Sequence, residues 1–423
     1  MGRRAFVGLA LAGIVSAAGA AAWLWRGAAV PQPAPPVAAA TPDATTIARG
    51  AQVARAGNCL ACHTARGSAK GAGGRPITTP FGTVYSANLT PDDATGLGRW
   101  AADDLWRALH EGRSRDGRRL VPACPYPSFT HVTRADIDAL HAWLRTLPPA
   151  QSPNRAHELR FPYQTQWALA AWQFLFFEPG EFTPRADRSA EWNRGAYLVR
   201  GLGHCAECHA PRNAFGALRD AESLAGARMA GQAWYAPSLA APDEAGVTAA
   251  TVDDVVALLQ HGISRQGSAA GPMAEVVAGS TSHLPRGDLR AIAVYLADLP
   301  RPSPRDAGAR PVEAAAGQLA LGRAVYEKHC ADCHGEAGEG RPGAYPALAG
   351  NRAVALADPL NVLRAILGGG FAPTTAGNPR PHGMPPYASV LDDAEVAAVA
   401  SYIRSTWGNA ARPVGELEVL RLR

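Results

Sequence analysis

Three short stretches decide the fold of this chain: Cys59-Leu60-Ala61-Cys62-His63, Cys205-Ala206-Glu207-Cys208-His209 and Cys330-Ala331-Asp332-Cys333-His334. Each has the form CxxCH, in which two thiols can bond to the two vinyl groups of one porphyrin while the histidine binds its iron. A single CxxCH could be a redox dithiol, half of a zinc site or chance. A zinc site needs four ligands, and no second CxxC or HxxxH lies near any motif. We therefore predict three covalent haem c groups, with the histidines as proximal iron ligands.

Each motif belongs to one copy of a pattern that occurs three times along the chain. A copy opens with a short helix that contains a glycine, continues through Gly- and Pro-rich sequence, and closes with an amphipathic helix. The opening glycines are Gly50, Gly195 and Gly322, and the closing helices are expected at 133–147, 285–299 and 392–407. Because glycine permits close approach, opening and closing helices should cross at these glycines.

The predicted fold class is all-α, with three tandem class I-like cytochrome c domains behind an N-terminal transmembrane anchor or signal sequence. Apolar residues at three- and four-residue steps support the closing helices; in the last one Val396, Val399, Ala400 and Ile403 share a face. The expected segments are an anchor or signal at 1–30, a Pro-rich linker at 31–45, domains at 46–150, 190–300 and 315–410, a connecting segment at 151–189 and a second linker at 301–314.

The first residues indicate export from the cytoplasm. Met1-Gly2-Arg3-Arg4 is basic, and the uncharged stretch after it runs to Trp25 and is followed by Arg26. Small residues at Ala18-Gly19-Ala20 would suit cleavage, whereas the length of the stretch and its Trp-rich end favour an uncleaved anchor. Both alternatives place the remainder on the periplasmic side, and we expect an inner-membrane location. The net charge of +5 without a Lys/Arg-rich run argues against nucleic acid as a partner.

Methionines are the usual sixth ligands of such haems, and the chain has only four of them. Met384 and Met273 follow the third and second motifs and precede the closing helices, so we expect them to be the distal ligands there. Met229 follows the second motif too closely and is expected to pack in a core.

The first domain contains no methionine, and Cys124 stands at the equivalent place. Cys124-Pro125-Tyr126 parallels Met384-Pro385-Pro386-Tyr387, and Cys124 is the one cysteine of seven outside a CxxCH motif. We expect Cys124 to be the distal ligand of the first haem. Ligation by His110 or His131, or an open position beside a thiol, are the alternatives. A thiolate ligand would lower the reduction potential relative to methionine.

The connecting segment has a densely apolar centre, Trp167–Phe177, which is too short to cross a membrane. It is expected to be either a helix buried between domains or a docking surface for a partner subunit or the bilayer surface.

The chain resembles the membrane-bound, three-haem cytochrome c subunits that accompany periplasmic dehydrogenases. The stretches that carry the resemblance are GNCLACHT and PACPYPSFT in the first domain, GLGHCAECHAPRNAFG and GPMAEVV in the second, and HCADCHGEAGEG and MPPYASVLDDAEVAAVASYIRSTWGN in the third. The resemblance implies a catalytic partner of the PQQ, flavin or molybdopterin type, and ubiquinone or a terminal oxidase as electron acceptor. Cys124 departs from it, because many relatives have methionine there.

The leading hypothesis is electron transfer from such a dehydrogenase, with no substrate site in this chain, which has no GxGxxG after a strand. The alternative is a self-contained haem oxidoreductase, for example one that oxidises sulfur compounds at a Cys-ligated first haem. A haem-based sensor is a third possibility, but the sequence has no signalling domain.

Overall fold

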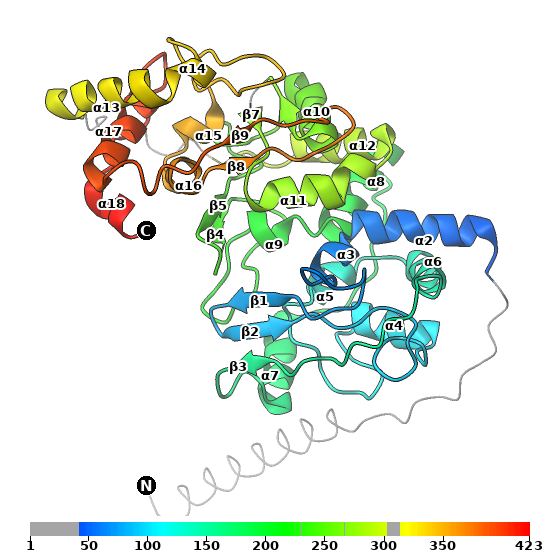
Figure 1. Ribbon diagram of the computed structural model, residues 1–423. Coiled ribbons are helices and arrows are strands. Elements are labelled where there is room, and N and C mark those ends of the chain that lie inside the picture. The colour runs from blue at the N-terminus through cyan, green and yellow to red at the C-terminus, as the bar shows by residue number, and fades with distance from the viewer. Residues whose placement is uncertain (1–41, 230, 266, 303–313) are drawn as a thin grey trace, which may run out of the picture. The chain divides into compact units, whose positions relative to one another are not determined.

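The computed structural model describes residues 42–229, 231–265, 267–302 and 314–423 (Figure 1). The expected anchor or signal at 1–30 and most of both linkers, 31–45 and 301–314, lie outside the described residues. Within the described ranges, no helix is both long enough and apolar enough to cross a membrane.

The chain divides into two compact units. Of the described residues, one unit contains 42–53 together with Cys62–Phe182, and the other contains Ala54–Ala61 together with those from Thr183 to Arg423. The first predicted domain thus falls mainly in the first unit, whereas the second and third predicted domains share the second unit.

Helices and one small sheet form the first unit. Strands β1 and β2 pair antiparallel from Pro76 opposite Tyr85 to Thr79 opposite Gly82, and β3 adds to β2 with Leu159 opposite Gly82. The elements are α2 (Ala44–Ala56), α3 (Cys59–Cys62), β1 (Pro76–Thr79), β2 (Gly82–Tyr85), α4 (Ala102–His110), α5 (Tyr126–Phe129), α6 (Arg134–Leu144), β3 (Glu158–Leu159) and α7 (Gln166–Phe176), with α2 and α3 reaching into the second unit.

The second unit is also mainly helical, and its strands form three two-stranded ribbons. Its first half contains α8 (Ala190–Tyr197), a π-helical turn (Leu198–Leu202), α9 (Ala206–His209), β4 (Ala227–Met229), β5 (Trp234–Ala236), α10 (Val252–His261), β6 (Ile263–Ser264), β7 (Gly267–Ser268), α11 (Pro272–Gly279) and α12 (Arg286–Ala297), with 3-10 turns at Ala249–Thr251 and Thr281–His283. Its second half contains α13 (Ala316–His329), α14 (Ala331–His334), α15 (Arg352–Ala355), α16 (Leu360–Gly368), β8 (Gly370–Phe371), β9 (Gly383–Met384), α17 (Asp393–Ser405) and α18 (Glu416–Leu420). The mostly helical character is confirmed.

The predicted crossing of opening and closing helices at glycine is confirmed in all three copies. A Cβ atom on each opening glycine would overlap a backbone carbonyl oxygen of the closing helix and lie 2.7–2.8 Å from the Cβ of an aromatic residue one turn later. The matching sets are Gly50 with Ala139 and Trp143, Gly195 with Ala291 and Tyr295, and Gly322 with Ala398 and Tyr402. The backbones therefore touch at a point where no side chain fits; Figure 1 shows the third pair, α13 and α17, at the C-terminal end of the chain.

Buried residues of the closing helices contribute to the cores, and in α17 every residue from Val396 to Ser401 is buried, so burial there extends around the helix. In α17 the four residues predicted to share a face are all buried: Val396, Val399, Ala400 and Ile403. This core continues past residue 410, where the third domain was expected to end, because Val414 and Val419 are buried in the same cluster. The C-terminal residues thus belong to the third core.

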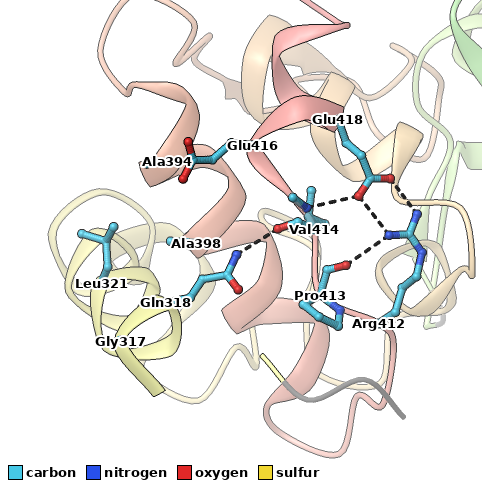
Figure 2. Close-up of a pocket in the computed structure, with 11 residues that line it drawn as sticks. Gly317, Gln318, Leu321, Ala394, Ala398, Arg412, Pro413, Val414, Glu416 and Glu418 are labelled. Atoms are coloured by element: carbon cyan, nitrogen blue, oxygen red, sulfur yellow. Dashed lines mark hydrogen bonds and ion pairs between the residues drawn. The ribbon is translucent and has the colours of Figure 1, made fainter. Parts of the chain in front are cut away.

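The C-terminal segment returns along α13 and α17 and borders an open pocket of about 580 Å³ (Figure 2). Gln318 Nε2 donates a hydrogen bond to the Val414 carbonyl over 2.9 Å, and Arg412 forms an ion pair with Glu418 over 2.7 Å. The Gln318 contact, together with a hydrogen bond from the Val414 N–H to Ser401 Oγ over 2.8 Å, holds the segment on α13 and α17, whereas the ion pair lies within the segment itself.

Helix α7, at the centre of the connecting segment, is buried on one side only. Leu169, Ala170 and Gln173 are buried, whereas Trp167 and Phe174 are 58% and 67% exposed. Within its own unit the helix packs its inner side on the Tyr126 region and leaves its outer side exposed. Burial of this helix between domains stays a prediction. The outer side as a docking surface stays a prediction.

Candidate haem-binding sites

Each CxxCH motif folds into a single helical turn. These turns are α3, α9 and α14, and each follows an opening helix. Residues three and four positions apart lie on the same side of a helix, so such a turn can present both thiols and the histidine together. All seven cysteines lie in the described part of the chain, and none is in a disulfide bond. The described residues contain no group of three or more His, Cys, Asp or Glu arranged to hold a metal ion.

The three motif histidines are oriented in the same way. In each, Nδ1 lies at hydrogen-bond distance from a backbone carbonyl oxygen later in the chain: His63 to Ala87 over 2.7 Å, His209 to Pro237 over 2.7 Å and His334 to Pro346 over 2.9 Å. With Nδ1 donating its proton to the carbonyl, Nε2 carries the lone pair that binds a metal. The hydrogen bond thus fixes both the tautomer and the direction of the ring.

Burial lowers the pKa of His63, His209 and His334 below the ordinary value for histidine, although the carbonyl contact acts in the opposite direction. A histidine must be neutral to bind a metal. These three imidazoles are therefore in the form that an iron ligand requires at neutral pH.

A glycine closes each loop between a motif histidine and its carbonyl acceptor; we call these loops the proximal loops. The glycine N–H donates to the carbonyl of the histidine itself, for Gly73 and His63 over 2.8 Å, for Gly226 and His209 over 2.8 Å, and for Gly340 and His334 over 2.7 Å. All three have φ between 66° and 81°, and a Cβ on each would lie 2.5–2.7 Å from backbone atoms at the acceptor carbonyl. The sequence alone does not reveal these three glycines, because the number of residues between each glycine and its histidine differs from copy to copy.

These donor sets fit covalently attached haem. Each place offers two thiols at one helical turn and a half-buried imidazole with a lowered pKa, whose ring is oriented by a hydrogen bond to a backbone carbonyl. The cysteines Cys59, Cys62, Cys205, Cys208, Cys330 and Cys333 would hold the porphyrin. The histidines would bind iron, which supplies one-electron chemistry when bound.

Met384 lies near the third motif. It is half-buried in β9 and packs against the same core cluster as Cys330. Three residues later, the hydroxyl of Tyr387 donates to the carbonyl of His329, directly before the motif, over 2.7 Å. This arrangement supports Met384 as the distal ligand, and that role stays a prediction.

The other two expected distal ligands begin or precede short helices. Met273 is half-buried in the first turn of α11, and Cys124 is half-buried just before α5. Burial raises the pKa of the Tyr126 hydroxyl, and the nearby Cys124 thiolate raises it further. Met229 is in β4, opposite Trp234. The ligand roles of Met273 and Cys124 stay predictions.

The two histidines considered as alternatives to Cys124 both contact backbone carbonyls. His110 Nδ1 lies 3.0 Å from the Thr130 oxygen, and its ring stacks on Trp106 with 4.3 Å between centroids. His131 Nδ1 lies 2.9 Å from the Gly180 oxygen. Each ring is held by one nitrogen, and ligation would have to use the other.

Comparison with known proteins places the chain among the c-type cytochromes. The Cytochrome c family profile matches residues 47–148 and 319–407. Similar proteins include a nicotinate dehydrogenase subunit of Pseudomonas putida (42% identity over 402 residues, 93% of this chain and 33% of the relative) and the cytochrome c subunit of alcohol dehydrogenase (quinone) of Gluconobacter oxydans (38% over 398 residues, 90% and 83%). The gluconate 2-dehydrogenase cytochrome c subunit of Pantoea cypripedii is 34% identical over 385 residues, 86% of each chain.

The chain belongs to the family of cytochrome c subunits of dehydrogenases, as the resemblance implied. It spans about a third of the nicotinate dehydrogenase subunit and most of the alcohol and gluconate dehydrogenase subunits. The family profile matches two segments and leaves out the residues between them. In that intervening region, Gly195, His209 and Gly226 nevertheless repeat the helix crossing and proximal loop of the other two copies.

Proposed function

We propose that this chain transfers electrons through three covalently bound haem c groups, one in each of three tandem domains. It would receive them from a catalytic dehydrogenase subunit and pass them to membrane quinone or a terminal oxidase. The observation that carries the proposal is the proximal arrangement, which has the same hydrogen bonds and the same glycine in all three copies.

The haem count is tested by a pyridine haemochrome assay on denatured, fully matured protein. Thioether bonds survive unfolding, so three haems per chain should remain with the polypeptide. A value of two would remove the middle domain from the proposal, because that domain lies outside the family profile.

The partner is a dehydrogenase of the PQQ, flavin or molybdopterin type. Similar proteins are named as subunits of nicotinate, alcohol, gluconate and fructose dehydrogenases, which supports a catalytic partner without selecting one. The candidate to test is the large dehydrogenase encoded beside this chain. Its substrate should reduce the haems when both proteins are mixed, and should leave them oxidised when this chain is alone.

Residues 1–30 would hold the protein at the periplasmic side of the inner membrane. The uncharged stretch from Ala5 to Trp25 supports this location. The full-length protein should fractionate with the inner membrane, and replacing residues 1–30 by a cleavable signal should release it. Soluble periplasmic full-length protein would contradict the anchor.

In the second candidate function, the first haem itself oxidises a sulfur compound. The half-buried thiol of Cys124, which the sequence places where the distal ligand is expected, favours it. Purified protein reduced by thiosulfate without any partner would support this function, and haems that stay oxidised would leave electron transfer as the role of all three.

A further inference from the structure

A buried carboxylate lies seven residues beyond the end of the proximal loop of His209, at Glu244. Glu244 is 2% exposed, and its Oε2 accepts a hydrogen bond from the Ser238 N–H over 2.6 Å. The Tyr235 hydroxyl lies 3.0 and 2.8 Å from the two carboxylate oxygens. Both oxygens thus meet a donor, which is the hydrogen-bonding pattern of an ionised carboxylate.

This carboxylate is joined to the proximal histidine through one peptide group. The Ser238 N–H that binds Glu244 and the Pro237 carbonyl that binds His209 Nδ1 belong to the same peptide bond. The sequence of contacts is carboxylate, peptide N–H, peptide C=O and imidazole N–H, with lengths of 2.6 and 2.7 Å at its two hydrogen bonds. We call this arrangement the peptide relay.

The first copy has the same relay with a neutral group at its end. His63 Nδ1 bonds to the Ala87 carbonyl, and the N–H of the same peptide, on Asn88, donates to Asn154 Oδ1 over 2.8 Å. Asn154 is exposed, whereas Glu244 is buried. The two relays therefore have the same hydrogen bonds and differ in the side chain at the end away from the histidine. That side chain is an exposed, neutral amide in the first copy and a buried carboxylate in the second.

Hydrogen bonds in series polarise one another, and an ionised acceptor strengthens the series most. A carboxylate on the peptide N–H increases the negative charge on the carbonyl oxygen, which then accepts more strongly from the imidazole. The imidazole becomes a more basic ligand. A more basic ligand and a nearby negative charge both stabilise ferric iron over ferrous iron, which has one positive charge less.

We propose that Glu244 lowers the reduction potential of the haem at His209 by acting through the Pro237–Ser238 peptide. The inference rests on the proposed function, because it requires a haem at His209. Glu244 is a positioning residue, since it acts on His209 through the Pro237–Ser238 peptide. If both methionine assignments hold, this haem would lie below the haem at His334 in potential.

Residues of the third copy, in the same compact unit, hold this loop in place. Asn361 accepts from the Tyr235 N–H over 2.9 Å and donates to the Tyr235 carbonyl over 2.8 Å. Arg352 donates to the Gly246 carbonyl over 2.9 Å, two residues beyond Glu244, and its positive charge offsets part of the carboxylate field. The relay geometry is therefore fixed by contacts on both sides of the loop.

The test is a redox titration of the full-length, three-haem protein and of Glu244→Gln, which keeps an oxygen acceptor for Ser238. One of the three waves should move to higher potential, with its reduction equilibrium constant raised roughly tenfold, since charged hydrogen bonds are about twice as strong as neutral ones. Asp243→Asn is the matched control. It removes the same charge from the adjacent, exposed residue, and we expect its shift to be at most about twofold because water screens it.

Asn154→Asp is the reciprocal experiment, because it places a carboxylate at the end of the first relay. A different wave should move to lower potential, by less than in Glu244→Gln because residue 154 is exposed. Equal shifts in Glu244→Gln and Asp243→Asn, or no shift in either relay variant, would overturn the relay. If Glu244→Gln fails to retain haem, the Asn154→Asp variant decides the question. A shift of its wave to lower potential supports the relay, and no shift or a shift to higher potential contradicts it. A haemochrome count of two in the unmodified protein would count against the proposed function instead.

Discussion

The first and third copies have matching proximal sides and different distal sides. His63 and His334 make the same carbonyl contact, whereas the expected distal ligand is a cysteine in the first copy and a methionine in the third. Covalent attachment requires both thiols and the histidine in one turn, so substitutions there remove the cofactor. The distal ligand is a single residue, and changing it alters the potential while the haem stays attached.

The helix crossings of the first and third copies share the glycine at the crossing point and differ in the residue that precedes this glycine. In the first, Arg49 on α2 pairs with Asp136 on α6 over 2.6 Å, and the second copy repeats this with Arg194 and Asp288 over 2.8 Å. In the third, Leu321 precedes the crossing glycine and borders the pocket in Figure 2, where the C-terminal segment packs. The residue before the crossing glycine is thus an arginine in an ion pair in the first two copies, and a leucine that stays 39% exposed in the third.

The largest expected effect is the loss of one haem. Cys62→Ala and Cys333→Ala each remove a thioether, and each should lower the haemochrome count by one while the other two haems remain. A loss of one haem in each variant would show that the CxxCH motifs of the first and third copies each attach one haem. Retention of all three haems in either variant would contradict the assignment of that motif.

The next largest effect concerns the helix crossing. Gly322→Ala would place a methyl group on the Ala398 carbonyl, and overpacking of this kind costs about 1–3 kcal/mol of unfolding free energy. Gly317→Ala on the same helix is the control, because a Cβ there has no neighbour within 4 Å. We expect the control to stay within about 1 kcal/mol of the parent, on the stabilising side. Chemical denaturation followed at the haem absorbance would measure both.

The distal side is tested at Cys124. Cys124→Met should raise the potential of one haem, because a thioether donates less charge to iron than a thiolate, and should make the first copy resemble the third. Cys124→Ala should leave a high-spin ferric iron. Unchanged electron paramagnetic resonance spectra and potentials in Cys124→Ala would make His110 or His131 the next candidate.

The smallest effect concerns the ion pair between Arg412 and Glu418, within the C-terminal segment of the third copy. A hydrogen bond from Arg412 lowers the pKa of Glu418 below the ordinary carboxyl value. A lowered folded-state pKa stabilises the fold above the unfolded-state pKa, and this contribution is lost as the pH falls through the folded-state value. Because both side chains are about a third exposed or more, we expect at most about 1 kcal/mol. Melting temperatures of the parent and Glu418→Gln should differ at neutral pH and converge in acid.

Much of the fold could be predicted because its signals lie close together in the sequence. The closing helices were expected at 133–147, 285–299 and 392–407, and α6, α12 and α17 lie inside those ranges. Their crossing at the three glycines was predicted because a glycine recurs at one place in each copy. The one-sided burial of α7 was not predicted, because an apolar run does not reveal how much partner surface is available to cover it.

The sequence by itself determined the three CxxCH motifs as the expected places of haem attachment and their histidines as the expected iron ligands, because that chemistry requires adjacent residues on one helical turn. The tertiary structure alone decided what surrounds those histidines. Gly226, Pro237 and Glu244 are far from His209 in sequence, and they meet it only because the proximal loop folds back on itself. A glutamate next to an aspartate in a loop has the sequence signature of a solvated surface, and only loop closure buries Glu244 while leaving Asp243 in water.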